Sequence, residues 1–294
     1  MGGWSLLLWV PLSPRLLPAH PSGGKMRVLF FGDLVGEMAI RYLEGNLPRL
    51  RRELGVDFVV VNGENADLTD PALGKAGMHP ETVDRLLACG VDAITGGNHS
   101  FDPPWAEDLL DHPRVLRPLN AGPFAPGRGY LVLEGRGKGL VVVNLVGRSA
   151  WPPADDPVWA LEGLLPGLEA GMPVLVDFHS ESVFEKLGSA FALDGRVAAV
   201  LGTHTHVPTH DLRILPRGTA YVSDVGMVGP SGGMQGYEPG FLVAALRRKR
   251  LPRGGRLAWA RGPLEVGAVV VDLDGGRAKA IQRLQALQGV PQGG

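Results

Sequence analysis

The feature that most restricts the fold of this chain is a series of short runs that are apolar at nearly every position. A strand with one face in water alternates apolar and polar residues, so a continuously apolar run indicates a strand that is buried on both faces. Several strand candidates have this character. The candidates are residues 27–31, 58–62, 93–95, 140–146, 174–178, 197–201, 220–222 and 266–272.

Helical patterns lie between these strand candidates. Residues 80–89 begin with a proline in the first turn and stop before a glycine, and residues 103–110 and 180–192 follow the same logic. The alternation of strands and helices predicts a layered α/β fold, in which antiparallel strands after Gly240 close an edge. Residues 38–54 also form a helical pattern that places five apolar side chains on roughly one face: Met38, Leu43, Leu47, Leu50 and Leu54.

The chain has 294 residues and shows neither an internal repeat nor a long linker. We therefore predict one domain over residues 26–294, because Met26 opens the first strand candidate. Residues 1–25 are interpreted as a disordered arm or an upstream extension. Their apolar stretch, residues 4–12, is too short to span a bilayer and lacks the flanks of a secretory signal.

Charge and cysteine content narrow the class of protein further. The formal net charge is -1, so no global basic field attracts nucleic acid. The one local candidate is residues 247–250, and such a run is more typical of a solvated loop or strand edge. Cys89 is the single cysteine, which excludes a disulfide within the chain and suits a reducing compartment. We expect a cytoplasmic protein without a membrane span.

Polar side chains follow five of the strand candidates at the point where each apolar run ends. Ligands of open α/β sheets bind beyond the carboxyl ends of the strands, so we expect these five endings to meet on one face. The residues at the endings are Asp33 after the first run, Glu64 and Asn65 after the second, Asn98 and His99 after the third, His179 after another, and His204 and His206 after the last.

Each ending has a plainer explanation when it is taken alone. Asp33, Glu64 and Asn65 could simply cap a helix or a loop. The pair His204-x-His206 is more specific, because residues two apart in an extended segment point the same way. Two glycines before the third ending allow the backbone to approach a bound group closely. Five such endings in one chain favour a metal site.

The number and type of donors indicate two ions. Seven donors exceed what one ion with open positions can use, and a carboxylate shared between two ions accounts for them better. Imidazole, carboxylate and amide donors without cysteine suit iron, manganese or zinc, and iron or manganese is preferred. Two ions about 3.5–4 Å apart bind phosphoryl oxygens and generate hydroxide near neutral pH. The seven donors are Asp33, Glu64, Asn65, Asn98, His179, His204 and His206.

These residues resemble the calcineurin-like metallophosphoesterases, with two departures. No histidine follows Asp33 at the usual place, and Glu64 and Asn65 stand where that superfamily commonly has Gly-Asp-x-x-Asp. With these departures, the sequence resembles the YmdB family, whose members are described as 2′,3′-cyclic-nucleotide 2′-phosphodiesterases. The motifs that carry this resemblance are Gly-Asp-Leu-Val-Gly (32–36), Asn-Gly-Glu-Asn (62–65), Gly-Gly-Asn-His (96–99), Gly-Thr-His-Thr-His-Val (202–207) and Ser-Asp-Val-Gly-Met-Val-Gly-Pro (223–230).

The resemblance implies a metallophosphoesterase sandwich of central sheets flanked by helices, with the active site at the carboxyl ends of the strands. It also implies a role for each donor. Glu64 bridges the two metals, and His99 donates a proton to the leaving oxygen, although His99 could instead be a structural histidine near the metals. The implied ligands of the first metal are Asp33, Asn65 and His206, and those of the second are Asn98, His179 and His204.

The expected reaction is hydrolysis of a phosphodiester by metal-activated hydroxide, with general acid catalysis by His99. The expected substrates are 2′,3′-cyclic nucleotides, with 3′,5′-cyclic nucleotides as a second class and RNA as a further partner. Association into homo-oligomers is left open. The alternative hypothesis is a regulatory protein that binds a phosphate ligand or RNA at the same metal site with little turnover.

Overall fold

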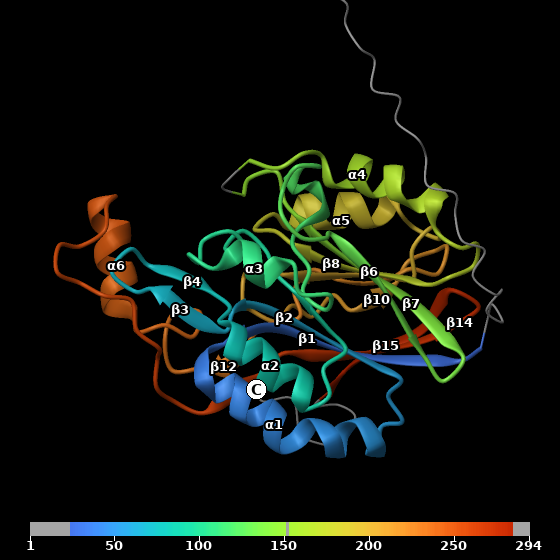
Figure 1. Ribbon diagram of the computed structural model, residues 1–294, viewed down its shortest axis with the longest axis horizontal. Helices are drawn as coiled ribbons and strands as arrows, with labels where there is room; N and C mark the ends of the chain where they lie inside the picture. The colour runs from blue at the N-terminus through green and yellow to red at the C-terminus, as the bar shows by residue number, and fades with distance from the viewer. Residues whose placement is uncertain (1–23, 151–152, 285–294) are drawn as a thin grey trace, which may run out of the picture.

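The computed structural model describes residues 24–150 and 153–284. The arm predicted over residues 1–25 lies outside this part of the chain except for Gly24 and Lys25. The described residues form two large β-sheets that pack face to face, with helices on both outer faces (Figure 1). The layered α/β fold predicted from the sequence is confirmed.

The first sheet is built around its longest strand, β1. Strand β1 pairs in parallel with β2 on one side, and with the antiparallel β14 on the other. β2 in turn pairs in parallel with β5. The strands of this sheet are β1 (Met26–Val35), β2 (Phe58–Asn65), β5 (Ala93–Thr95), β12 (Val228–Pro230), β13 (Leu264–Val266), β14 (Ala268–Asp274) and β15 (Arg277–Arg283).

The second sheet has a parallel centre and two antiparallel edges. Strands β7, β8, β9 and β11 run parallel to one another, and β6 and β10 close the edges. The strands of this sheet are β6 (Tyr130–Gly135), β7 (Lys138–Val146), β8 (Val174–His179), β9 (Ala199–Thr203), β10 (Arg213–Ile214) and β11 (Ala220–Val222).

Helices cover the outer face of each sheet, while one helix and a small hairpin stand apart. Figure 1 shows α1 and α2 below the first sheet, α4 and α5 above the second, and α6 beside the β3–β4 hairpin at the outer left edge. The helices are α1 (Gly36–Glu53), α2 (Pro80–Ala88), α3 (Ala106–Leu110), α4 (Pro157–Leu164), α5 (Val183–Ala192) and α6 (Pro239–Arg248), with short 3-10 turns at η1 (Leu119–Ala121) and η2 (Leu165–Gly167); the hairpin is β3 (Asp67–Asp70) and β4 (Lys75–Gly77).

The continuous apolar runs are explained by this layering. Successive side chains of β1 point to opposite faces, so Val28 and Phe30 enter the core between the two sheets, while Leu29 and Phe31 enter the core beneath α1 and α2. The second sheet shares the central core and has a third core of its own beneath α4 and α5. No helix in the described ranges combines the length and apolar character needed to cross a bilayer.

The structure also corrects several expectations about the elements. Strands β1 and β2 run beyond residues 31 and 62, so Asp33 lies inside a strand, at a register irregularity against Asn62. The antiparallel strands after Gly240 are present, but helix α6 precedes them, and residues 247–250 extend from its last turn rather than from a strand edge. The sequence signal for α6 was Glu238-Pro239, a cap followed by a proline in the first turn. Strand β6, helix α4 and the β3–β4 hairpin were also missed.

Burial between the sheets predicts which phenylalanine matters for stability. Phe30 is fully buried in the central core, whereas Phe124 is 99% exposed. We expect Phe30→Ala to lower the free energy of unfolding by about 3–5 kcal/mol, because it removes buried apolar surface and leaves a cavity. Phe124→Ala, the matched control, should change it by less than about 0.5 kcal/mol. Urea unfolding of the full chain measures both, and similar values for the two variants would contradict this assignment of the core.

Candidate metal centre

The polar side chains at the five strand endings meet at one place, as predicted. This place lies where the carboxyl ends of the parallel strands of both sheets come together. The backbone N–H of His204, the residue after β9 of the second sheet, donates to Asp33 Oδ2 in the first sheet at 3.1 Å. Deeper in the interior, Asn62 Nδ2 donates to Asp177 Oδ2 at 2.8 Å, again across the two sheets. The candidate centre therefore lies on the seam between the sheets.

One half of the centre contains Asp33, Asn65 and His206. His206 Nε2 lies 3.0 Å from Asn65 Oδ1 and 3.7 Å from Asp33 Oδ1. The other ring nitrogen of His206, Nδ1, lies 2.8 Å from the backbone oxygen of Gln235. That contact fixes the ring orientation and leaves Nε2 for a ligand, as in many metal-binding histidines.

The other half contains Asn98, His179 and His204. His179 Nε2 lies 3.2 Å from Asn98 Oδ1 and 3.0 Å from His204 Nδ1. Glu64 Oε1 lies 3.4 Å from the same His179 nitrogen. All seven donors expected from the sequence are thus within one cluster, although their role as metal ligands stays a prediction.

Two buried oxygens indicate that this cluster fits cations. Asp33 Oδ1 and Glu64 Oε2 have no hydrogen-bond partner among the described residues, although both carboxylates are buried. An unpaired buried carboxylate oxygen is costly, so it needs a partner that protein atoms do not supply. Donors that share an ion at about 2.1 Å lie roughly 3–3.5 Å apart, close to the spacings between these side chains.

The histidine and carboxylate side chains of the cluster do not by themselves form a complete coordination sphere. Within the described ranges, no three histidine, cysteine, aspartate or glutamate side chains by themselves are grouped so that they could hold an ion. The amides of Asn65 and Asn98 would therefore have to complete the coordination of an ion bound here. Pairs that contact each other, such as His206 and Asn65, would turn slightly toward a shared cation.

The electrostatics of the cluster show an excess of negative charge. Burial raises the pKa of Glu64, but the charge and hydrogen bond of His179 together with those of His99 outweigh burial and hold the pKa at about 2. Burial lowers the pKa of His179, yet Glu64 and Asp33 raise it to about 9. The pKa of His204 falls to about 3, because of burial and the neighbouring His179 charge. Buried carboxylates thus demand a positive charge here, which a metal cation would supply while leaving the imidazoles neutral.

Gly96 and Gly97 allow the third ending to approach His179 closely, whereas the approach to a bound group stays a prediction. A methyl group on Gly97 would lie 2.3 Å from Cδ2 of the His179 ring, and one on Gly96 would lie 2.2 Å from Ser100 Oγ. Neither position has room for a side chain. The backbone of this loop therefore lies directly on His179 and brings Asn98 beside it.

The His204–His206 segment differs from the expectation of an extended backbone. His204 has φ 99 and His206 has φ 65, and such left-handed conformations are strained for residues other than glycine. Both rings still reach the centre, because the surrounding contacts impose this turn. Asp224 Oδ2 accepts hydrogen bonds from the backbone N–H and the hydroxyl of Thr205, at 3.0 and 2.8 Å.

A fully buried lysine completes this support. Lys186 Nζ donates to the backbone oxygen of Thr203 at 2.7 Å and pairs with Asp224 Oδ2 at 3.1 Å. Neither Lys186 nor Asp224 was identified as part of the site from the sequence. The only signal was the position of Asp224 in the 223–230 motif, because nothing local predicts a contact over 38 residues.

Asp177 is a second supporting residue that the sequence did not reveal. It is fully buried beneath His179, where it accepts hydrogen bonds from Asn62, Thr95 and Thr203. Burial raises its pKa to about 6, and the charge of His179 and these hydrogen bonds oppose the shift. Its role is to hold together the ends of four strands beneath the candidate ligands.

His99 lies beside the cluster rather than in it. Its backbone N–H donates to Glu64 Oε1 at 2.6 Å, and its Nδ1 lies 2.8 Å from Asp102 Oδ2. Burial lowers the pKa of His99, but Asp102 and Glu64 outweigh burial and raise it above the ordinary value. His99 also lines a cavity of about 230 Å³ together with His206, Tyr237 and Leu257.

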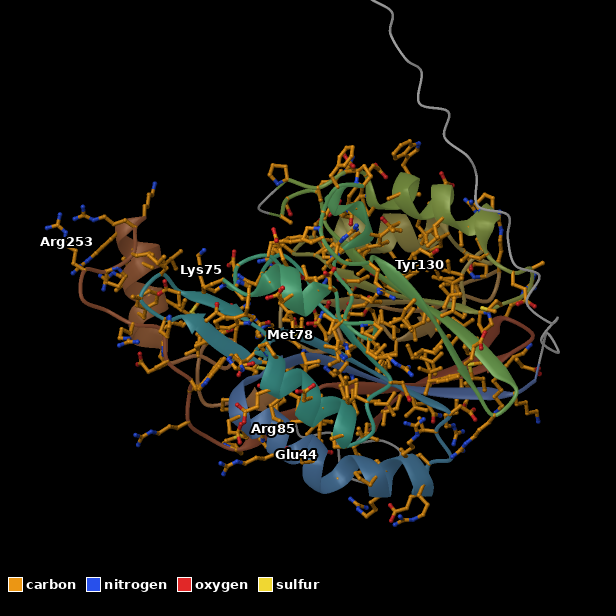
Figure 2. The ribbon with its side chains drawn as sticks, viewed as in Figure 1. Glu44, Lys75, Met78, Arg85, Tyr130 and Arg253 are labelled. Atoms are coloured by element: carbon orange, nitrogen blue, oxygen red, sulfur yellow. The ribbon has the colours of Figure 1, made fainter. Side chains whose placement is uncertain are left out.

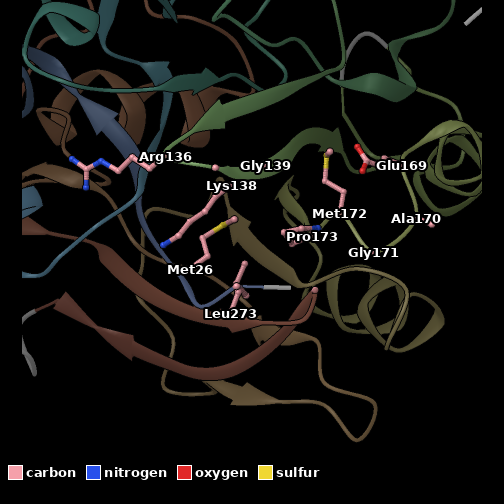
Figure 3. Close-up of a pocket in the computed structure, with 13 residues that line it drawn as sticks. Met26, Arg136, Lys138, Gly139, Glu169, Ala170, Gly171, Met172, Pro173 and Leu273 are labelled. Atoms are coloured by element: carbon pink, nitrogen blue, oxygen red, sulfur yellow. The ribbon is translucent and has the colours of Figure 1, made fainter. Parts of the chain in front are cut away.

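Another cavity lies far from this chemistry. It has a volume of about 180 Å³ and lies where the strands begin, with Met26, Lys138, Met172 and Leu273 around it (Figure 3). Its lysine already pairs with Asp57 at 2.8 Å. The cavity beside His99 adjoins the candidate metal ligands, and so does a further cavity of about 300 Å³ that is lined by Asn98, His179 and His204.

Solved structures resemble this fold closely. The crystal structure of a hypothetical protein from Thermus thermophilus superposes with a TM-score of 0.78 at 40% identity, covering 88% of this chain and 98% of that one. A novel phosphatase from Mycoplasma pneumoniae gives a TM-score of 0.78 at 29% identity, covering 89% and 93%. The NAD nucleotidase of Haemophilus influenzae, at 11% identity and a TM-score of 0.51, shares the fold alone.

Sequence comparison agrees with these structures. A 2′,3′-cyclic-nucleotide 2′-phosphodiesterase of Bacillus subtilis is 39% identical over 259 residues, which cover 87% of this chain and 95% of that protein. The family model described as YmdB-like protein matches residues 29–284, a span that contains all of the candidate ligands. By fold, motifs and sequence, this chain belongs to the YmdB-like protein family.

Proposed function

We propose that this chain is a two-metal phosphodiesterase that hydrolyses cyclic nucleotides, with 2′,3′-cyclic nucleotides as the principal substrates and 3′,5′-cyclic nucleotides as a second class. The observation that carries the proposal is the pair of unsatisfied buried oxygens, Asp33 Oδ1 and Glu64 Oε2, among seven metal donors beside a cavity. The activity named for the Bacillus subtilis relative supports the choice of substrate.

The donors divide into two sets around Glu64. We assign Glu64 as the bridge, and iron or manganese as the metal, because imidazole, amide and carboxylate donors suit these ions. When bound, two such ions polarise phosphate oxygens and activate water near neutral pH. The first set is Asp33, Asn65 and His206, and the second is Asn98, His179 and His204.

His99 is assigned as the proton donor. In a 2′,3′-cyclic nucleotide, the oxygen of a water joins phosphorus, the bond between phosphorus and the 2′ oxygen breaks, and that oxygen has to gain a proton. Asp102 contacts Nδ1 of His99, which leaves Nε2 as the nitrogen that can donate a proton to the substrate. Asp102 also favours the protonated ring that a general acid requires.

The metal assignment predicts the metal content of the protein. Elemental analysis of the full chain, purified without oxygen, should find two equivalents of iron or manganese. Glu64→Gln should lose at least one equivalent and reduce phosphodiesterase activity by about 10²-fold or more, because the bridging charge is gone. Glu53→Gln, at an exposed position on α1, is the control. Full activity with one equivalent or none would contradict the two-metal assignment.

The proton-donor assignment predicts how His99→Ala depends on the leaving group. The variant should keep near-normal metal content, while kcat for 2′,3′-cyclic nucleotides falls by roughly 10²-fold or more. The loss should be much smaller for a nitrophenyl phosphodiester, because nitrophenolate departs without a proton. His210→Ala changes an exposed histidine and should affect neither substrate. An equal loss on both substrates, together with loss of metal, would make His99 a structural residue instead.

The same assays separate catalysis from the alternative of a regulatory binder. A metal-loaded wild-type protein that binds cyclic nucleotides but turns over neither these nor the nitrophenyl diester would contradict the proposed enzyme.

A further inference from the structure

A dense group of positive charges extends from the end of helix α6. No acidic residue occurs between positions 239 and 264, while this segment holds seven of the 29 lysines and arginines of the chain. All seven side chains belong to exposed residues. We call them the α6 basic surface: Arg247, Arg248, Lys249, Arg250, Arg253, Arg256 and Arg261.

The cations of this surface are not balanced by the protein. Some exposed basic side chains elsewhere pair with acids, as Arg85 does with Glu37 and Glu44 (Figure 2). Among the residues that the structure describes, none of the seven makes an ion pair or a side-chain hydrogen bond. The helix dipole favours Arg247 and Arg248 in the last turn of α6, but it does not explain the other five.

The segment that carries the α6 basic surface also lines the cavity beside the candidate metal centre. Leu257 donates its backbone N–H to Pro71 in the β3–β4 turn, at 2.7 Å. From the same segment, Leu242 and Leu257 line the cavity that also contains His99 and His206. The segment thus has one side at the cavity and the other in solvent.

A further cation lies between the two regions. Lys75 follows the β3–β4 turn, and its Nζ lies 3.9 Å from Asp102 Oδ1, the carboxylate group that holds His99. Figure 2 shows Lys75 on the inner side of α6 and Arg253 at the outer edge of the molecule. Lys75 is therefore a cation between the carboxylate that contacts His99 and helix α6.

We propose that the α6 basic surface binds the phosphate backbone of single-stranded RNA whose 3′ end carries the 2′,3′-cyclic phosphate hydrolysed at the metal centre. This proposal rests on the proposed function and names its substrate class. A 2′,3′-cyclic phosphate remains on a strand when its own 2′ oxygen displaces the downstream nucleoside, so oligonucleotides carry the same reactive group as mononucleotides. Hydrolysis adds water across the bond to the 2′ oxygen and leaves a 3′-phosphate.

The position of the surface favours RNA over a lipid membrane. Val243, Leu246 and Leu251 are exposed among the cations and could contact either bases or lipid. A mononucleotide that occupies the cavity cannot use cations beyond it, whereas an oligonucleotide reaches them with its upstream phosphates. Neutralised phosphates release counterions, so such binding weakens with salt.

The test uses the full metal-loaded chain and labelled oligoribonucleotides of 2, 4, 8 and 12 residues that end in a 2′,3′-cyclic phosphate, with the mononucleotide as reference. We expect kcat/KM to rise roughly tenfold or more from the mononucleotide to the 8-mer at low salt, and this advantage to disappear at high salt. The triple variant Arg247→Gln, Arg250→Gln, Arg253→Gln should lose most of the advantage and keep its mononucleotide rate within about twofold, because uncharged substitutions leave the cavity unchanged.

A matched variant controls for general loss of charge. Arg52→Gln, Arg136→Gln and Arg277→Gln remove three exposed cations near the opposite end of the strands, and this triple variant should keep the length dependence. In binding assays, the α6 variant should also reduce the slope of log affinity against log salt by about two. No length dependence in the wild type, or an equal loss on mononucleotide and 8-mer in the α6 variant, would overturn the proposal.

Two further outcomes distinguish this proposal from membrane binding and from failure of the proposed function. Binding to phosphatidylserine vesicles that depends on the α6 cations, without any length dependence, would assign the surface to a membrane and overturn the RNA proposal. If the wild type hydrolyses no cyclic phosphate, the proposed function fails by itself. In that case, fluorescence anisotropy of the labelled 8-mer tests RNA binding by the α6 basic surface. Weaker binding by the α6 variant than by the wild type supports RNA binding there, and unchanged binding overturns it.

Discussion

Everything at the candidate centre depends on two sheets being packed face to face with their parallel strands ending on the same side. The central core contains Phe30 and Val60 from the first sheet and Val142 and Leu201 from the second. Packed sheets keep their strands nearly aligned, so the carboxyl ends of both sheets share one edge. Polar side chains from both sheets can then meet there, while the rest of the sandwich stays dry.

The seam concentrates buried charge that the fold must balance. Asp33, Glu64 and Asp177 are all buried, and burial of an ion costs several kcal/mol unless partners compensate for it. Asn62, Thr95 and Thr203 satisfy Asp177, but Asp33 and Glu64 each keep one oxygen without a hydrogen bond among the described residues. A cation that binds only the folded chain would stabilise it through mass action, which ties folding to the chemistry of the site.

Much of this arrangement could be predicted from the sequence, because local pattern and position along the strands determine it. Apolar runs placed β1, β8 and β9, and the polar residues at their ends placed the donors. The backbone of His204 and His206 could not be predicted, because their positive φ values arise from distant contacts. Lys186 and Asp224 were missed for the same reason, since their contact joins a helix to a loop 38 residues away.

The small core around Tyr237, Phe241 and Leu257 is separate from the three cores that hold the sheets together. This small core and the hydrogen bond from Leu257 to Pro71 join the α6 segment to the β3–β4 hairpin beside the cavity. The two packed sheets and the segments beside the cavity, α6 and the β3–β4 hairpin, are therefore held by separate cores. Redesign of residues 67–77 and 238–262 could change which phosphodiesters enter without changing a residue of the three main cores.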